Sequence, residues 1–175
     1  VQDQIDLYFS TFAKSMASIG AFIAGDKKII DYIRYNIRSQ IFAKSLPMPL
    51  VIGNLKRLEL LRTQPQLKEK LWENARKLQN GLKERGFDIG KTDSVVTPVY
   101  MTGGVEEATS MVMDLRENYK IFCSIVVYPV IPKGHIIYRL IPTSVHTDAD
   151  IQETLKAFSA TKKKLDAGEY KVAAI

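Results

Sequence analysis

The sequence predicts an α/β protein in which helices cover one face of a sheet. Three observations support this fold class. Short apolar runs alternate with segments in which apolar residues recur at helical spacing. Two apolar runs in the C-terminal half are separated only by a turn sequence, which favours an adjacent strand pair. The chain has 175 residues and 46% apolar content, which is enough to bury a core.

The first part of the chain predicts two strands followed by a helix. Residues 5–9 (IDLYF) are expected to form a buried strand, and residues 21–25 (AFIAG) a second one. Asp26 is a good N-cap for a helix over residues 27–40, in which isoleucines recur at helical spacing. Lys14 therefore lies in the connection between the two strands.

The middle of the chain predicts two helices in succession. Two prolines punctuate residues 45–49 (SLPMP), and a helical pattern then covers residues 50–62. The pattern pauses at residues 63–65 and resumes as far as Arg85, where Gly86 is the expected C-cap. The second helix carries an apolar stripe that we expect to be a packing face, formed by Leu67, Leu71, Ala75, Leu78 and Leu82 with Trp72 beside them.

The C-terminal half alternates strands and helices. The predicted elements are a strand at 94–101, a helix at 106–119, a strand at 120–131, a strand at 135–143 and a final helix at 148–165. Thr147 or Asp148 is expected to cap the final helix.

Composition and charge argue against several classes of function. The net charge is +6, but basic and acidic residues alternate along amphipathic segments, and the one basic run, at 162–164, has no aromatic residues among it. We therefore expect no nucleic-acid partner. One cysteine and two scattered histidines give no metal-ligand spacing and no internal disulfide, so Cys123 is expected in the core, as fits a reducing cytoplasm.

The termini and apolar runs favour a soluble, cytoplasmic protein. No window approaches the roughly 18 uninterrupted apolar residues that a membrane span needs, and no signal-peptide pattern is seen at the N-terminus. The sequence begins with Val1 and leads at once into an apolar run. We interpret it as a piece of a longer protein.

Lys14 lies in the segment STFAKSMASIGAFIAGD at residues 10–26, where small residues surround it. It follows a predicted buried strand, and Thr11 places a hydroxyl three residues before it. A lysine amine in a partly desolvated pocket has a lowered pKa and can form a Schiff base with pyridoxal 5'-phosphate (PLP), whose phosphate Thr11 could then hold. The spacing alone leaves open an ordinary surface lysine.

Four segments in order resemble the α-oxoamine synthases, the fold-type I PLP enzymes that include serine palmitoyltransferase, 8-amino-7-oxononanoate synthase and glycine C-acetyltransferase. The segments are STFAKSMASIGAFIAGD at 10–26, SLPMP at 45–49, SVVTPVYM at 94–101 and YPVIPKGHIIYRLIPTSVHTDADI at 128–151. Within the family they are most similar to serine palmitoyltransferase. The resemblance covers essentially the whole chain.

The resemblance implies a fold-type I PLP-transferase, of which this chain is the C-terminal part. Residues 1–47 would be a remnant of the large PLP-binding domain, and residues 48–175 an α+β small domain with an antiparallel sheet and helices on one face. The implied activity is condensation of an amino acid with an acyl-CoA, with loss of carbon dioxide, in a homodimer. Lys14 would carry the cofactor, remove the substrate's α-proton and later return a proton.

The resemblance also implies roles for three other residues. Thr11 would contact the cofactor phosphate, Ser45 would reach the phosphate of a neighbouring subunit, and Arg139 would bind the substrate carboxylate. A guanidinium among apolar neighbours on a central strand needs an anion, whereas an arginine on an edge strand could simply face solvent. The chain departs from the family pattern at Ala13 and Ala43, where hydroxyl residues often stand, so two phosphate contacts are in question.

Two further expectations concern what the chain does by itself. His146 matches a family histidine, and we expect it to cap a helix or lie in the core. The family's cofactor site also uses residues from the preceding half of the protein, so this chain alone is expected to bind PLP poorly and to have no turnover. A non-catalytic assembly or regulatory module of the same fold remains the alternative, although the presence of Lys14 favours an enzyme.

Overall fold

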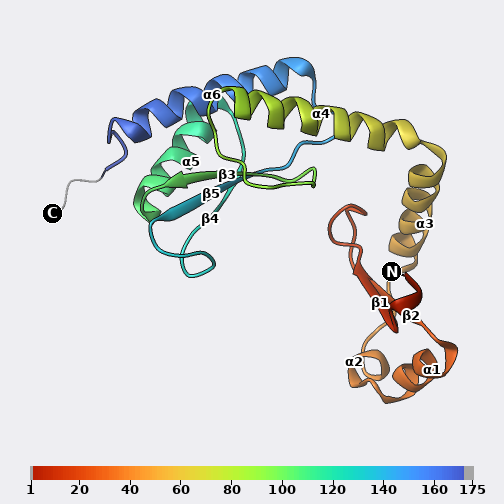
Figure 1. Ribbon diagram of the computed structural model, residues 1–175. Helices are drawn as coiled ribbons and strands as arrows, with labels where there is room; N and C mark the ends of the chain where they lie inside the picture. The colour runs from red at the N-terminus through yellow and green to blue at the C-terminus, as the bar shows by residue number, and fades with distance from the viewer. Residues whose placement is uncertain (1, 172–175) are drawn as a thin grey trace. The chain divides into compact units, whose positions relative to one another are not determined.

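The computed structural model describes residues 2–171 and divides into two compact units, Val1–Pro65 and Gln66–Ile175 (Figure 1). The domain boundary predicted after residue 47 was placed by resemblance to the family and not by the compactness of the units. The division after Pro65 therefore does not test it, and it stays a prediction.

The N-terminal unit contains a two-stranded antiparallel sheet and helices of 3 to 16 residues. Leu7 faces Gly25 and Thr11 faces Ala21 across the strand pair, so the connection at 12–20 carries Lys14. The elements are the 3-10 helix η1 (Gln2–Gln4), strands β1 (Leu7–Thr11) and β2 (Ala21–Gly25), and helices α1 (Lys27–Asn36), α2 (Arg38–Ile41) and α3 (Met48–Thr63).

The predicted helix over residues 27–40 begins as expected but is interrupted. Asp26 caps it, since its side chain accepts a hydrogen bond from the Lys28 N–H at 2.8 Å. At the other end the Asn36 side chain donates to the Tyr32 carbonyl at 2.8 Å, and Ile37 then adopts an extended conformation. The prediction of a single helix is therefore wrong, because one extended residue separates α1 and α2.

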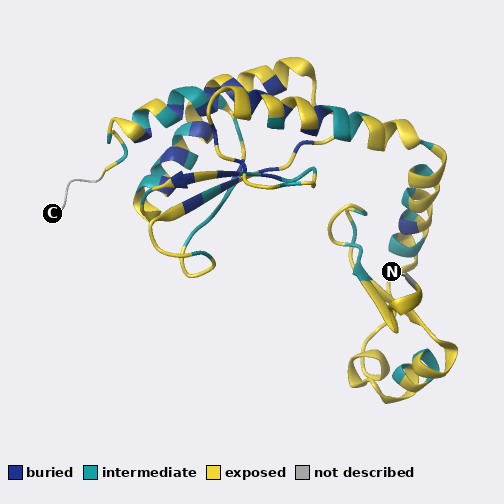
Figure 2. Cartoon of the chain, in the orientation of Figure 1, coloured by how far each residue is buried: buried dark blue, intermediate teal, exposed yellow. Residues whose placement is uncertain are grey.

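The prediction that residues 5–9 form a buried strand is wrong about burial. The strand is present, but its apolar side chains are exposed, and Phe9 is 66% exposed. No layer of the described residues in this unit covers the β1–β2 pair, and only Asn54 is buried among the side chains described there (Figure 2). The apolar side chains of β1 and β2 are therefore largely uncovered within this unit.

The C-terminal unit contains a three-stranded antiparallel sheet of order β3–β5–β4. Val99 and Ile125 both face Tyr138, so β5 is the central strand. The elements are α4 (Pro65–Glu84), β3 (Thr97–Thr102), α5 (Val105–Tyr119), β4 (Ser124–Val126), β5 (His135–Leu140) and α6 (Asp148–Asp166).

Alternation along the strands gives this sheet one buried face, which α4, α5 and α6 cover (Figures 1 and 2). The opposite face carries His135 and Arg139, both exposed. This confirms the predicted antiparallel sheet with helices on one face. The core includes Leu78 and Leu82 of α4, Met111 and Leu115 of α5, Leu155 and Phe158 of α6, and Val99, Ile136 and Tyr138 of the sheet.

The apolar stripe predicted on α4 is buried only in its second half. Ala75, Leu78 and Leu82 lie in the interior, whereas Leu67 is exposed. Cys123 is buried as predicted, and burial raises the pKa of its thiol to about 11, which makes it unreactive at neutral pH.

The predicted strand over 120–131 is much too long, since only Ser124–Val126 pairs with β5. The following residues include Pro129, which has no N–H to donate to a ladder. The predicted cap of the last helix is confirmed at Thr147, whose hydroxyl accepts from the Asp150 N–H at 3.2 Å. Within residues 2–171, no helix combines the length and the apolar character that a membrane span requires.

Candidate functional site

Lys14 lies in a loop whose backbone is fixed by hydrogen bonds on both sides. The Phe12 N–H donates to the Gly20 carbonyl at 2.9 Å, and the Ser18 N–H donates to the Phe12 carbonyl at 2.9 Å. The Lys14 carbonyl itself accepts from the Ala17 N–H at 2.8 Å. Lys14 therefore begins a tight turn, and its Cα is held at the end of β1.

The backbone requires one of the small residues near Lys14. Gly20 has φ +104°, a conformation that residues with a Cβ rarely adopt. Ala17 has φ +44°, which gives alanine no advantage over other residues with a side chain. A Cβ on Gly20 would lie 2.8 Å from a methyl group of Leu46, so the loop packs closely on the segment before α3. The geometry of the loop thus explains part of the small-residue pattern. It does not explain Ala13 and Ser15, the two small residues directly beside Lys14.

Thr11 is placed to donate a hydrogen bond beside Lys14. Its Oγ1 accepts from the Ala13 N–H at 2.8 Å, which leaves the hydroxyl proton free for another acceptor. A phosphate oxygen is such an acceptor, so the loop suits the lysine-bound, phosphate-bearing cofactor that the sequence implies. The Lys14 side chain is exposed, and no described side chain of its own unit supplies the desolvation that this chemistry needs.

Ser45 lies in the same unit, in the segment that leads into α3, and it is exposed. Its neighbour Leu46 is the residue that packs on Gly20 at the end of the Lys14 loop. The structure therefore places Thr11 at the end of β1 and Lys14 in the loop that follows it, and it places the segment bearing Ser45 against that loop. The predicted phosphate contacts of Thr11 and Ser45 stay predictions.

Arg139 lies on the central strand β5, on the face of the sheet that the helices leave open. Its position on a central strand was predicted, but the side chain is exposed rather than buried among apolar groups. The Nε–H donates to the Ser124 hydroxyl on β4 at 3.1 Å. Both terminal nitrogens of the guanidinium then remain available for a carboxylate.

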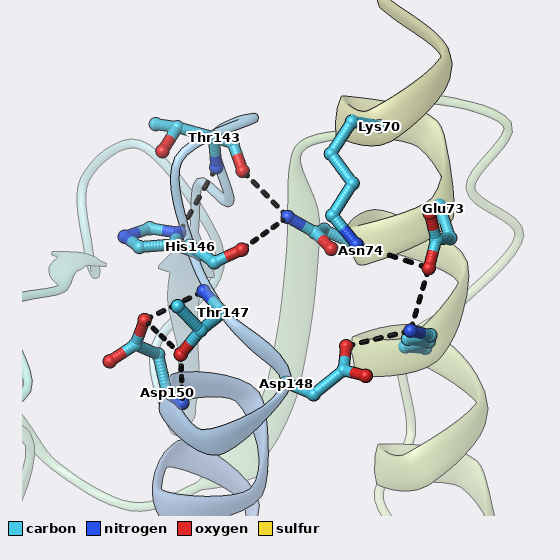
Figure 3. Close-up of polar contacts among 9 residues, drawn as sticks. Lys70, Glu73, Asn74, Thr143, His146, Thr147, Asp148 and Asp150 are labelled. Atoms are coloured by element: carbon cyan, nitrogen blue, oxygen red, sulfur yellow. Dashed lines mark hydrogen bonds and ion pairs between the residues drawn. The ribbon is translucent and has the colours of Figure 1, made fainter. Parts of the chain in front are cut away.

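The segment after β5 is held by a buried asparagine of α4 that the sequence interpretation missed (Figure 3). The Asn74 side-chain NH₂ donates to the Thr143 carbonyl at 3.0 Å and to the His146 carbonyl at 2.8 Å. The only signal in the sequence was a polar residue inside the predicted apolar stripe. Asn74 fixes the backbone that follows the strand bearing Arg139.

His146 has a local structural role, but the expectation that it caps a helix or lies in the core is wrong, because it is exposed and the N-cap is Thr147. Its Nδ1 accepts a hydrogen bond from the Thr143 N–H at 3.1 Å. The residue is exposed and directly precedes the N-cap Thr147 (Figure 3). His146 therefore closes the turn that starts α6.

Charged residues join the same turn to α4. Lys77 pairs with Glu73 and with Asp148, both at 2.6 Å, and donation to Asp148 and then to Glu73 raises the pKa of Lys77. The pKa of Asp150 is lowered because the Thr147 N–H and hydroxyl donate to its carboxylate. These groups are exposed, so their ion pairs contribute little to stability compared with the buried Asn74.

Replacing Asn74 by alanine is expected to lower the free energy of unfolding by about 1–3 kcal/mol for each carbonyl left without a donor. The buried Nδ2 group that serves both acceptors would be lost. Urea unfolding followed by the fluorescence of Trp72, the single tryptophan, measures the change. Asn80→Ala, at an exposed site of the same helix, is the control and should change little. An Asn74→Ala protein as stable as the wild type would contradict this role.

Comparison with known proteins finds one family and a consistent set of relatives. Residues 1–158 match the family model described as aminotransferase class I and II. The cysteate-C-fatty acyltransferase of Capnocytophaga ochracea is 63% identical over 171 residues, 98% of this chain and 41% of that protein. The serine palmitoyltransferase (SPT) of Sphingobacterium spiritivorum is 35% identical over 88% of this chain and 38% of its own length. The chain spans about two fifths of the length of these relatives.

Solved structures with the same fold include enzymes of the same kind. The high-resolution structure of SPT with its PLP internal aldimine has a TM-score of 0.85 and 31% identity, over 93% of this chain and 41% of that one. The 8-amino-7-oxononanoate synthase of Francisella tularensis has a TM-score of 0.79 over 91% of this chain and 46% of its own, but its 21% identity supports the fold alone.

Proposed function

This chain belongs to the aminotransferase class I and II family, and we propose that it is part of an α-oxoamine synthase that condenses cysteate with a fatty acyl thioester. The resemblance to α-oxoamine synthases and the fold-type I PLP-transferase fold, both predicted from the sequence, are confirmed by these relatives and structures. The single observation that carries the choice of cysteate is 63% identity with a cysteate-C-fatty acyltransferase over nearly the whole chain.

Serine is the second candidate for the amino acid. The sequence motifs resemble those of serine palmitoyltransferase, and an enzyme of that name is 35% identical over 88% of this chain. Cysteate has a sulfonate where serine has a hydroxyl, so the two substrates differ by a fixed negative charge. The higher identity to the cysteate enzyme favours the more anionic substrate.

In the proposed reaction a bond forms between the substrate Cα and the thioester carbonyl carbon. The carbon–sulfur bond of the thioester breaks, the thiol leaves with a proton, and the substrate carboxyl group leaves as carbon dioxide. When bound, PLP supplies the electron sink that stabilises negative charge at Cα. Lys14 would hold that cofactor, take the proton from Cα and return one to the same carbon of the product.

The other site residues would bind and orient. Thr11 would donate its free hydroxyl proton to the cofactor phosphate, and Ser45 would reach the phosphate in the neighbouring subunit of a homodimer. Ala13 and Ala43 offer no hydroxyl, so Thr11 would carry a larger share of the phosphate contacts. Arg139 would receive the substrate carboxylate on its two terminal nitrogens, while Ser124 holds Nε.

The proposal extends to the organisation of the intact enzyme. Residues 1–47 would complete the large PLP-binding domain and residues 48–175 form the small domain, in a cytoplasmic protein. The non-catalytic module is disfavoured because the chain has a lysine, a hydroxyl and an arginine at all three family positions. This chain by itself would bind PLP poorly, since Lys14 is exposed here.

The decisive experiment assays the intact protein with palmitoyl-CoA and each of cysteate, serine, glycine and alanine. Product is measured by mass spectrometry. We expect kcat/KM to be at least about tenfold higher for cysteate, because a site built for an additional anionic group rejects substrates that lack it. A preference for serine would make the protein a serine palmitoyltransferase. No product from any pair, with no PLP bound, would support the non-catalytic module.

A further inference from the structure

The chain turns back on itself directly after α6. Gly168 has φ +76°, a conformation that residues with a side chain rarely adopt. The Gly168 N–H donates to the Leu165 carbonyl and the Glu169 N–H donates to the Lys164 carbonyl, both at 3.0 Å, so the last carbonyls of the helix are paired. The turn brings the ring of Tyr170 onto the hydrophobic core of the C-terminal unit. Residues 167–171, which make this turn, form a strap.

Asp114 of α5 is the group that the strap reaches. Its side chain is only 8% exposed. One carboxylate oxygen, Oδ2, accepts from the Tyr170 hydroxyl and also from Nζ of Lys164 on α6, at 2.8 Å from the latter. The other oxygen accepts from the Asn118 side-chain NH₂ at 2.7 Å. A single buried carboxylate thus joins α5, α6 and the strap.

The Asp114 carboxylate is charged at neutral pH. Burial alone would raise its pKa, but donation from Lys164, Tyr170 and Asn118 outweighs burial, and the pKa is lowered. A buried charge that loses its partners is strongly destabilising. Lys164 and Asn118 both lie on helices, whereas Tyr170 lies in the short segment beyond the last helix. The three donors therefore differ in how easily they can leave.

We propose that the strap opens and closes as a separate element, with the hydrogen bond between Tyr170 and Asp114 as its latch. When the strap opens, Asp114 keeps Lys164 and Asn118, so no buried charge is left without a partner. The Tyr170 hydroxyl and the vacated carboxylate lone pair then bond to water. Opening costs one hydrogen bond and the packing of one ring, while the helices and the sheet stay folded. Such local openings need much less free energy than global unfolding.

Cleavage by chymotrypsin after residue 170 of the intact protein measures how often the strap opens, because the protease requires an extended, accessible chain. Tyr170→Phe removes only the hydroxyl and keeps a side chain that chymotrypsin recognises. We expect this cleavage, followed by mass spectrometry and corrected with matched peptides, to become about tenfold faster or more, since the lost hydrogen bond is to a charged group. Tyr100→Phe, at a 41% exposed position of β3, is the control and should leave the rate unchanged. An unchanged rate in Tyr170→Phe would overturn the proposal.

Low concentrations of urea separate opening of the strap from unfolding of the whole unit. Phe158 is fully buried in α6, so chymotrypsin reaches it only when the helices come apart. Unfolding exposes much surface, and cleavage after Phe158 should therefore rise steeply with urea. Opening of the strap exposes little surface, so cleavage after Tyr170 should rise only slightly. Parallel increases at the two sites would show that the strap opens only when the unit unfolds, and this would also overturn the proposal.

A double-mutant cycle tests whether the strap is held through Asp114. Asp114→Asn keeps the size of the side chain and removes its charge, so by itself it should speed cleavage after Tyr170. In a protein that already contains Tyr170→Phe, Asp114→Asn should add no more than about twofold, because the latch is already lost. No increase from Asp114→Asn by itself, or a full multiplication of the two increases, would show that Tyr170 does not act through this carboxylate and would overturn the latch.

Discussion

Replacing Lys14 by alanine in the intact protein is expected to abolish turnover. Loss of a positioned proton-transfer group alone costs about 10²–10⁴-fold in rate, and the same substitution removes the covalent attachment of the cofactor. The measurement is kcat with cysteate and palmitoyl-CoA. Borohydride reduction followed by peptide mapping should also label Lys14 in the wild type and give no labelled peptide from Lys14→Ala.

The fold should survive this substitution, because Lys14 contributes only its backbone carbonyl to the loop and its side chain is exposed. Circular dichroism provides that check. Lys28→Ala, at an exposed position in the first turn of α1, is the matched control and should keep full activity. An active Lys14→Ala protein, or borohydride labelling of another lysine in the wild type, would contradict the assignment of Lys14.

Replacing Arg139 by alanine is expected to have the second largest effect. It should raise the KM for the amino acid rather than the KM for the thioester. Removing one partner of a hydrogen-bonded charge pair costs about 2–5 kcal/mol, and the lower value is roughly a 30-fold rise in KM. Initial-rate kinetics with cysteate varied at fixed palmitoyl-CoA give this number. Arg139→Lys should recover part of the loss, because it keeps the charge but not the planar fork.

Two comparisons test whether Arg139 acts through direct contact. Ser124→Ala removes only the acceptor for Nε, so its effect on the amino acid KM should be smaller than that of Arg139→Ala. Arg116→Ala, at an exposed site of α5, controls for the loss of one positive charge and should change neither KM. An Arg139→Ala enzyme with an unchanged amino acid KM would place the carboxylate elsewhere.

The elements best predicted from the sequence are those whose signals are local. The helix expected at 50–62 is Met48–Thr63, and the last helix begins after Thr147 as its capping sequence predicted. A cap and the spacing of apolar residues lie within the helix itself, so no knowledge of the partner element is needed. The same reasoning identified Asp26 as the start of α1.

Strand extent and burial could not be predicted in the same way, because they depend on distant residues. The apolar run at 120–131 looks uniform, yet only Ser124–Val126 finds a pairing partner on β5. The run at 5–9 looks like an interior strand, but whether Phe9 is buried depends on a covering layer, and none of the described residues of its unit provides one. A single apolar run carries no information about what covers it.

Candidate site residues could be predicted where they belong to a sequence motif. They could not be predicted where their role depends on contacts that form only on folding. Lys14, Thr11 and Arg139 were proposed from sequence segments. The structure gives their positions and hydrogen bonds, and their roles stay predictions. Asn74 was overlooked because it is one polar residue in an apolar helix face. Its importance depends on which groups it faces after folding.

The two hydrogen bonds of Asn74 have a mechanical consequence for substrate binding. They join α4 to the segment that leaves β5, at a carbonyl four residues beyond Arg139. A displacement of α4 is therefore expected to reach the end of the strand that bears the guanidinium. Substitutions on that helix could in this way alter the recognition of the amino acid.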